Sequence, residues 1–125
     1  MITGRVTSER EPVVQTKVRA PGGRAESIWG VIDTGFSESL TLPRERIASP
    51  GLPFRGSQRA TLADGSEVIL AVYRALVEWH GRALPVLVLG TEGGALLGMA
   101  LPQDSRLTTN VVADGAVRIE PIAEA

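Results

Sequence analysis

Glycine and proline interrupt this chain every few residues, and this spacing restricts the fold more than any other feature of the sequence. The 125 residues include 14 Gly and 8 Pro, and the segments between them are short and rich in Val, Ile, Leu and Thr. Short aliphatic and β-branched segments between turn-forming residues are typical of β-strands. The sequence therefore predicts an all-β protein.

Several pairs of these segments are expected to form hairpins. Asp-Gly is a strong hairpin signal, because both residues tolerate the positive φ angles of a tight turn. The predicted strand pairs are 12–20 with 25–33 across "PGGR", 58–63 with 66–79 across Asp64-Gly65, and 106–113 with 116–122 across Asp114-Gly115. His80-Gly81 predicts a further turn before a strand at 82–90. A single domain over residues 1–125, forming a small, partly closed barrel of hairpins, is therefore expected.

Two segments have helical features. Residues 43–47 begin with Pro43, which favours the first position of a helical turn. Residues 96–104, "LLGMALPQD", predict a short helix that ends near Pro102. The predicted fold is thus all-β with one short helix after the "ALLG" segment at 95–98.

Composition and charge exclude several classes of function. The net charge is −1, and the 12 Arg and one Lys are scattered, whereas nucleic-acid-binding modules usually carry a basic stripe. The chain has no Cys, so disulfides and cysteine-based metal sites are excluded, and the single His has no metal-ligand spacing around it. The segment "MITGRVTSER" contains no apolar stretch, and the longest apolar run, "ALPVLVLG", is too short to span a membrane. We therefore expect a cytoplasmic protein with no metal, no cofactor, and no nucleic-acid or membrane partner.

One carboxylate stands where burial is expected. Asp33 ends an apolar run that contains Ile28, Trp29, Val31 and Ile32. Burying an ionised carboxylate is costly unless it is paired or hydrogen-bonded. Other aspartates have simpler explanations, since Asp64 and Asp114 are turn formers, and the single His80 is expected to be a solvated turn residue. Asp33-Thr34-Gly35 read alone is also compatible with an ordinary turn at a strand end.

The surroundings of this triplet favour a different interpretation. Asp33-Thr34-Gly35 follows Val31-Ile32 and precedes "SLTLP", and about sixty residues later comes "GALLGMAL" (94–101), with a long hairpin between them. This arrangement, over about residues 10–105, resembles the retropepsin-like aspartic proteases, in their bacterial and cellular form. The chain departs from the retroviral members in three places. Ser37 and Glu38 replace a more acidic stretch, and Met99 replaces an Arg. The chain also has an extra C-terminal hairpin at about 106–122.

The resemblance implies a role for each matching residue. Asp33 would be catalytic, with Thr34 and Gly35 supporting the catalytic loop. The hairpin at about 58–69 would be the flap that closes over substrate, with Ala63, Asp64 and Gly65 at its tip. Leu96, Leu97 and Gly98 would form the strand that crosses behind the loop.

The implied activity is peptide-bond hydrolysis by an aspartic endopeptidase. In this chemistry two carboxylates share one proton, so that one acts as base and the other as acid. The chain contains a single Asp-Thr-Gly and no Asp-Ser-Gly. A two-fold homodimer would supply the second carboxylate. Two alternatives remain open: a peptide-binding scaffold of the same fold with little or no hydrolysis, and a monomeric β-barrel interaction module in which Asp33 is an exposed turn residue.

Overall fold

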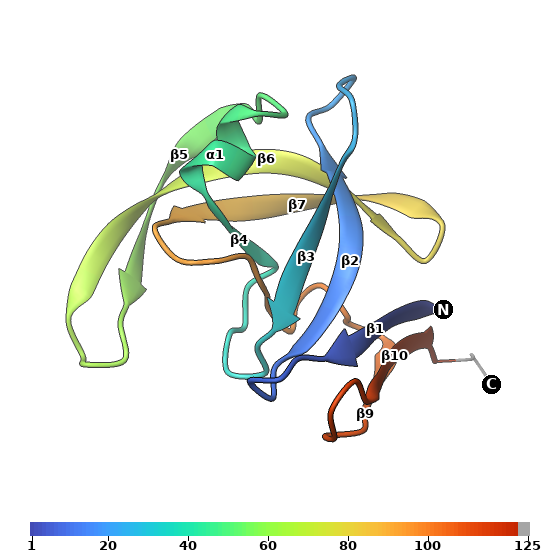
Figure 1. Ribbon diagram of the computed structural model, residues 1–125. Coiled ribbons are helices and arrows are strands. Elements are labelled where there is room, and N and C mark those ends of the chain that lie inside the picture. Colours follow the sequence, from blue (N-terminus) through green and yellow to red (C-terminus); the bar gives the residue numbers. More distant parts are fainter. Residues whose placement is uncertain (123–125) are drawn as a thin grey trace.

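The computed structural model describes residues 1–122 and consists of a mixed β-sheet with one short helix, α1 (Figure 1). The elements follow one another along the chain as β1 (Ile2–Val6), β2 (Pro12–Arg19), β3 (Glu26–Ile32), β4 (Leu40–Pro43), α1 (Arg44–Ala48), β5 (Phe54–Thr61), β6 (Glu67–Trp79), β7 (Arg82–Thr91), β8 (Leu96–Leu97), β9 (Ser105–Thr109) and β10 (Ala116–Pro121). The mostly-β character is therefore confirmed.

The sheet closes on itself only in part. Its strand order is β5-β6-β7-β4-β8-β3-β2-β1-β10-β9, and the far end of β6 also pairs with β2 through Val18 with Val77 and Arg19 with Leu76. This additional pairing joins β6, β7, β4, β8, β3 and β2 into a ring, from which β5 extends at one side and β1, β10 and β9 at the other. The ring is not a regular barrel, because β8 has two residues and β4 has four.

The predicted hairpins are present. β2 pairs with β3, β5 with β6, β6 with β7, and β9 with β10, all antiparallel. At the β6–β7 turn both His80 (φ 50°) and Gly81 (φ 77°) are left-handed, which is the two-residue turn whose twist matches that of the flanking strands. Gly65 (φ 86°) and Asp114 (φ 55°) are also left-handed, so each Asp-Gly pair supplies one left-handed residue to its turn. Both pairs lie in loops longer than two residues, at 62–66 and 110–115, and the strand predicted over 106–113 ends at Thr109.

The helix lies elsewhere than the "ALLG" segment predicts. After β8, residues 99–104 form turns. The helix α1 begins at Arg44, and Pro43 is its extended N-cap (φ −70°, ψ 160°) and not, as predicted, its first helical residue. Leu96 and Leu97 cannot be helical, because their backbone pairs with β3 on one side and β4 on the other. Among residues 1–122, no helix is long and apolar enough to cross a bilayer.

The core occupies the inside of the ring and extends under β1 and β10. Its largest fully buried side chains are Leu40, Leu42, Leu97, Leu101 and Ile119. The run before Asp33 is only partly buried: Ile28 and Ile32 face the core, but Trp29 is 52% exposed on the opposite face of β3. There the guanidinium of Arg5 lies 6.0 Å from the centre of the indole ring. The period-two alternation of a strand thus overrides the apolar character of the run.

Candidate active site

Asp33 lies at the end of β3, on the loop that joins β3 to β4 (residues 33–39, here the Asp33 loop). The residue is half-buried. Its backbone N–H donates to the Leu97 carbonyl oxygen (2.9 Å), and its side-chain Oδ1 accepts a hydrogen bond from the Gly35 N–H (2.9 Å). The carboxylate is therefore held by its own loop, with its backbone fixed by β8.

Gly35 has a different role from the one its residue type predicts. Its φ angle is not in the left-handed region, so the turn does not require a glycine there. A Cβ at this position would meet only Asp33 Oδ1, at 3.4 Å, which is an ordinary contact. What Gly35 supplies is the N–H that orients the Asp33 carboxylate.

Thr34 and Gly35 are both exposed. Within residues 1–122, the Thr34 hydroxyl makes no hydrogen bond. Thr34 thus lies on an open part of the loop, next to Asp33. The support that Thr34 is expected to give the catalytic loop stays a prediction.

β8 passes behind the Asp33 loop. Its two residues pair in parallel with Val31 and Ile32 of β3 and antiparallel with Leu40 and Thr41 of β4, so β8 separates the two strands that the loop connects. The Leu97 side chain fills the space where Gly30 lacks a Cβ. This close approach explains a glycine in the middle of β3.

Gly98 fixes the contact between β8 and the loop. Its N–H donates to the Ser39 carbonyl (2.9 Å), and the next N–H, of Met99, donates to the Phe36 carbonyl (2.7 Å). A Cβ on Gly98 would collide with the Glu38 carbonyl oxygen and lie 2.6 Å from the Phe36 ring. Only a glycine allows the two segments to pack at this distance.

Thr41 contributes a support that the sequence analysis did not identify. Its side chain is 5% exposed, and its Oγ1 accepts a hydrogen bond from the Leu96 N–H (3.1 Å) and donates one to the Gly94 carbonyl (3.3 Å). The hydroxyl therefore ties β4 to the start of β8. A polar residue between the apolar Leu40 and Leu42 is the one sequence signal for this position.

The β5–β6 hairpin, expected to be the flap, ends in a polar tip at residues 62–66. The Leu62 N–H donates to the Ser66 carbonyl (2.8 Å), and Asp64 Oδ1 accepts hydrogen bonds from the Ser66 hydroxyl (2.6 Å) and N–H (2.9 Å). These hydrogen bonds from Ser66 lower the pKa of Asp64. Ala63, Asp64 and Gly65 are all exposed. The tip is thus held by its own residues, none of which is buried.

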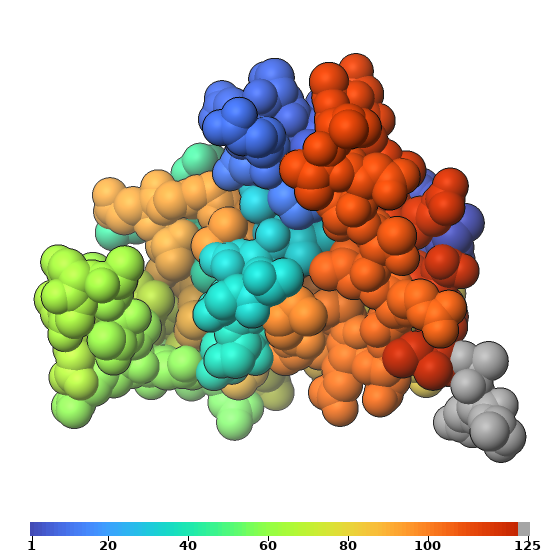
Figure 2. Space-filling model, turned by 90° about the horizontal axis from the view of Figure 1, so that it is seen from below, coloured from blue at the N-terminus to red at the C-terminus, as the bar shows by residue number. Residues whose placement is uncertain are grey.

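The hairpin tip and the Asp33 loop lie on the same face of the molecule. Figure 2 shows this face, with the tip of the β5–β6 hairpin (green) at one side, the Asp33 loop (cyan) near the centre, and a recess between them. The turns after Gly98 (orange) border the loop on its other side. Asp33, Thr34, Gly35, Leu96, Leu97 and Gly98 are therefore gathered at one place, and Ala63, Asp64 and Gly65 stand apart from them across the recess.

His80 is not the solvated turn residue that the sequence predicts. It is partly buried, and its Nε2 lies 3.0 Å from Ser105 Oγ. Burial, with the N-terminal ammonium and Arg82 nearby, holds its pKa below the ordinary value. In the part of the chain that the structure describes, no three His, Asp or Glu side chains converge as metal ligands would.

Comparisons with known proteins give no match. No protein-family model matches this chain, and no curated protein matches it. The functional argument therefore depends on the residues and on their arrangement.

Proposed function

We propose that the protein is an aspartic endopeptidase that works as a homodimer, in which the Asp33 residues of two chains form one catalytic pair. The observation that carries the proposal is the support of the Asp33 loop from behind by β8. A strand that ends in Asp-Thr-Gly and a second, apolar-apolar-Gly strand crossing behind the loop are the two features on which the resemblance to retropepsin-like proteases depends.

The chemistry follows from two carboxylates that share a proton. The ionised carboxylate takes a proton from a water molecule, whose oxygen attacks the peptide carbonyl carbon. The protonated carboxyl donates its proton to the carbonyl oxygen, which gives a tetrahedral diol. Proton transfer to the amide nitrogen then breaks the C–N bond. The Gly35 N–H supports this role, because it holds Asp33 Oδ1 and leaves the other carboxylate oxygen for water or for the partner.

The proposal requires two chains. The sequence has no second Asp-Thr-Gly or Asp-Ser-Gly, and an isologous dimer places identical residues next to its two-fold axis. The exposed Thr34 and Gly35 are compatible with a partner at this place.

The decisive experiment compares two conservative variants on an unstructured peptide library rich in apolar pairs. The parent protein should cleave, a statine-type inhibitor should block cleavage, and chelators and thiol reagents should have no effect. Asp33→Asn should abolish cleavage. Asp114→Asn, the same change in an exposed Asp-Gly turn on another hairpin, should cleave as the parent does. Chelator-sensitive cleavage by pure protein would exclude the mechanism.

A mixing experiment tests whether two chains share the site. When parent and Asp33→Asn protein are mixed in equal amounts and allowed to exchange, only about one quarter of random dimers carry two intact Asp33 residues. Activity per total protein should fall to about that fraction, whereas independent monomers would retain about half. If parent and Asp33→Asn both bind peptides tightly and neither cleaves them, the scaffold alternative is correct.

A further inference from the structure

A second site lies at the opposite end of β6 from the β5–β6 hairpin tip. β6 runs for 13 residues, from Glu67 near the tip to Trp79 before the β6–β7 turn, which is about 40 Å of extended chain. In Figure 1 this turn, the N-terminus and the end of β10 lie on one side of the molecule, away from that tip. There the structure contains a cavity of about 860 Å³ (here the His80 cavity).

The walls of the His80 cavity come from three separate segments. Trp79 and Leu84 line it from the β6–β7 hairpin, Leu101 from the turns after Gly98, and Pro121 and Ile122 from the end of β10. Small-molecule sites typically enclose about 300–1,000 Å³ and combine apolar walls with a few polar groups. The His80 cavity has this size and an apolar body of this kind.

The polar groups at this end of the cavity include one buried donor and one buried ring nitrogen that have no hydrogen-bond partner within residues 1–122. Trp79 is 4% exposed, and its Nε1–H is buried with no partner within residues 1–122. His80 Nδ1 is buried and unpartnered in the same part of the chain, while its Nε2 lies 3.0 Å from Ser105 Oγ. An indole N–H can only donate, and a buried donor without an acceptor is costly. This end of the cavity therefore favours a ligand that accepts hydrogen bonds.

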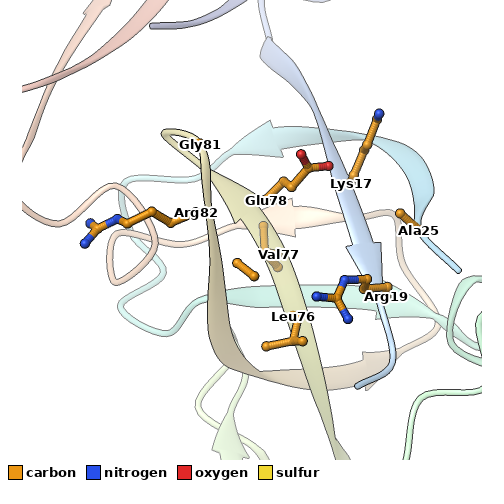
Figure 3. Close-up of a pocket in the computed structure, with 9 residues that line it drawn as sticks. Lys17, Arg19, Ala25, Leu76, Val77, Glu78, Gly81 and Arg82 are labelled. Carbon is orange, nitrogen blue, oxygen red and sulfur yellow. The ribbon is translucent and has the colours of Figure 1, made fainter. Parts of the chain in front are cut away.

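Arg82 adds a positive charge to the wall of this cavity, and the carboxylate of Asp104, which also lines the cavity, adds a negative charge without forming an ion pair with Arg82. Arg82 lines both the His80 cavity and a smaller pocket of about 270 Å³ on the other side of the β6–β7 hairpin. Figure 3 shows the smaller pocket, and in it the Arg82 side chain points away from Lys17, Arg19 and Glu78. No carboxylate in the described chain forms an ion pair with Arg82. Its guanidinium, with five donors in a fixed fork, matches the geometry of a carboxylate.

The β6–β7 turn and two side-chain contacts fix the position of the His80 ring. A left-handed φ of 50° is uncommon for a residue other than glycine, although His is one of the residues that tolerate it. The two rings of Trp79 and His80 pack edge to face, with centroids 5.7 Å apart. The imidazole is thus held between the indole and Ser105, at the polar end of the cavity.

We propose that the His80 cavity binds a small organic carboxylate, with its apolar body against Trp79, Leu84 and Leu101 and its carboxylate near Arg82 and the His80–Ser105 pair. This site is independent of Asp33 and of peptide hydrolysis.

The test uses a matched pair of probes, naphthalene-1-acetate and its neutral amide, naphthalene-1-acetamide. Binding is followed by the indole N–H signals in ¹H–¹⁵N spectra, and the signal that remains in Trp29→Phe is that of Trp79. We expect the acid to shift the Trp79 signal with a Kd of about 1 mM or tighter, as suits a ligand of this size. The amide should bind about five-fold or more weakly, because it lacks the charge-assisted hydrogen bonds.

Two arginine variants separate the site from general charge. Arg82→Gln should reduce the affinity for the acid to that for the amide. Arg106→Gln removes the same charge from an exposed position on β9 that does not line the cavity, and should leave the preference for the acid intact. Because Arg82 and Arg106 are both exposed, both variants should fold.

Three results would overturn the proposal. The first is a Trp79 signal that does not move with up to about 10 mM acid, well above the expected Kd. The second is equal affinity of the parent protein for acid and amide. The third is a Trp79 signal that changes on dilution without any probe, because this would mean that a second copy of the chain fills the cavity.

Discussion

Replacing Gly98 by Ala should damage both the fold and the candidate active site, because Gly98 is the point at which β8 touches the Asp33 loop. The added methyl group would collide with the Glu38 carbonyl oxygen and would lie 2.6 Å from Phe36 Cδ2 and 2.8 Å from the Phe36 carbonyl oxygen. Two of these three atoms are backbone, so the methyl group cannot be accommodated by a side-chain rotation. The loop must move away from β8.

The expected cost can be worked out from the contacts that are lost. Overpacking of this kind costs about 1–3 kcal/mol. Moving the loop also weakens the hydrogen bonds from Gly98 N–H to Ser39 and from Met99 N–H to Phe36, each worth about 1 kcal/mol. Alanine loses less chain entropy on folding than glycine, which offsets about 0.4–1 kcal/mol. The net destabilisation should therefore be about 2–3 kcal/mol.

Gly94→Ala is the matched control. Gly94 lies four residues earlier, is exposed, and has open space where its Cβ would be. Its φ angle is not left-handed, so alanine fits there, and the free energy of unfolding should change by less than about 0.5 kcal/mol.

Urea unfolding followed by circular dichroism gives the free energies of unfolding of all three proteins. Peptide cleavage, if the proposed function is correct, should be lost in Gly98→Ala even at low temperature, because the Asp33 N–H bond to Leu97 and the position of the carboxylate depend on the same contact. A Gly98→Ala protein as stable as Gly94→Ala would refute the reasoning, since the loop and β8 could not then be packed as described.

The remaining predictions concern pH, assembly, the flap and Thr41. His80 has a pKa below its ordinary value of 6.5, so the unfolded chain takes up a proton at higher pH than the folded chain does. The free energy of unfolding should therefore fall as the pH drops below about 6.5. His80→Asn, which keeps the left-handed turn, should flatten this pH dependence in urea titrations at pH 5 and 7. If two Asp33 carboxylates share a proton in the proposed dimer, assembly is linked to proton binding, and sedimentation should show a dimer that weakens from mildly acidic to alkaline pH. Asp33→Asn should dimerise at least as tightly as the parent at neutral pH, with a flatter pH dependence. An Asp33→Asn monomer alongside a parent dimer at every pH would contradict this. Amide exchange at residues 60–69 should be fast in the free protein and slow with a statine-type inhibitor, and exchange that a tight inhibitor leaves unchanged would argue against a closing flap. Thr41→Val should lower the free energy of unfolding by about 1–3 kcal/mol in urea titrations, because it leaves the Leu96 N–H without its hydrogen-bond acceptor. Thr108→Val, the same change at an exposed position, should leave the free energy of unfolding almost unchanged.

Features that depend only on neighbouring residues can be predicted from the sequence alone. Asp64-Gly65, His80-Gly81 and Asp114-Gly115 form turns because their residues tolerate positive φ angles, whatever the rest of the chain does. Pro43 likewise lies directly before α1, as its extended N-cap. Asp33 stands out in the sequence for an equally local reason, a carboxylate at the end of an apolar strand.

The places where distant segments meet depend on long-range packing and cannot be predicted from local sequence. The segment 96–104 has the composition of a helix, yet Leu96 and Leu97 form a strand because β3 and β4 both offer them backbone hydrogen bonds. Gly35 lies in the Asp33 loop and Gly98 packs against it, but only Gly98 is required by a close approach, which involves residues about sixty positions earlier in the chain. The contact between His80 and Ser105, which turns an ordinary turn residue into the wall of a cavity, has the same origin. Long-range backbone pairing and packing depend on which segments compete for the same place, and no short stretch of sequence contains that information.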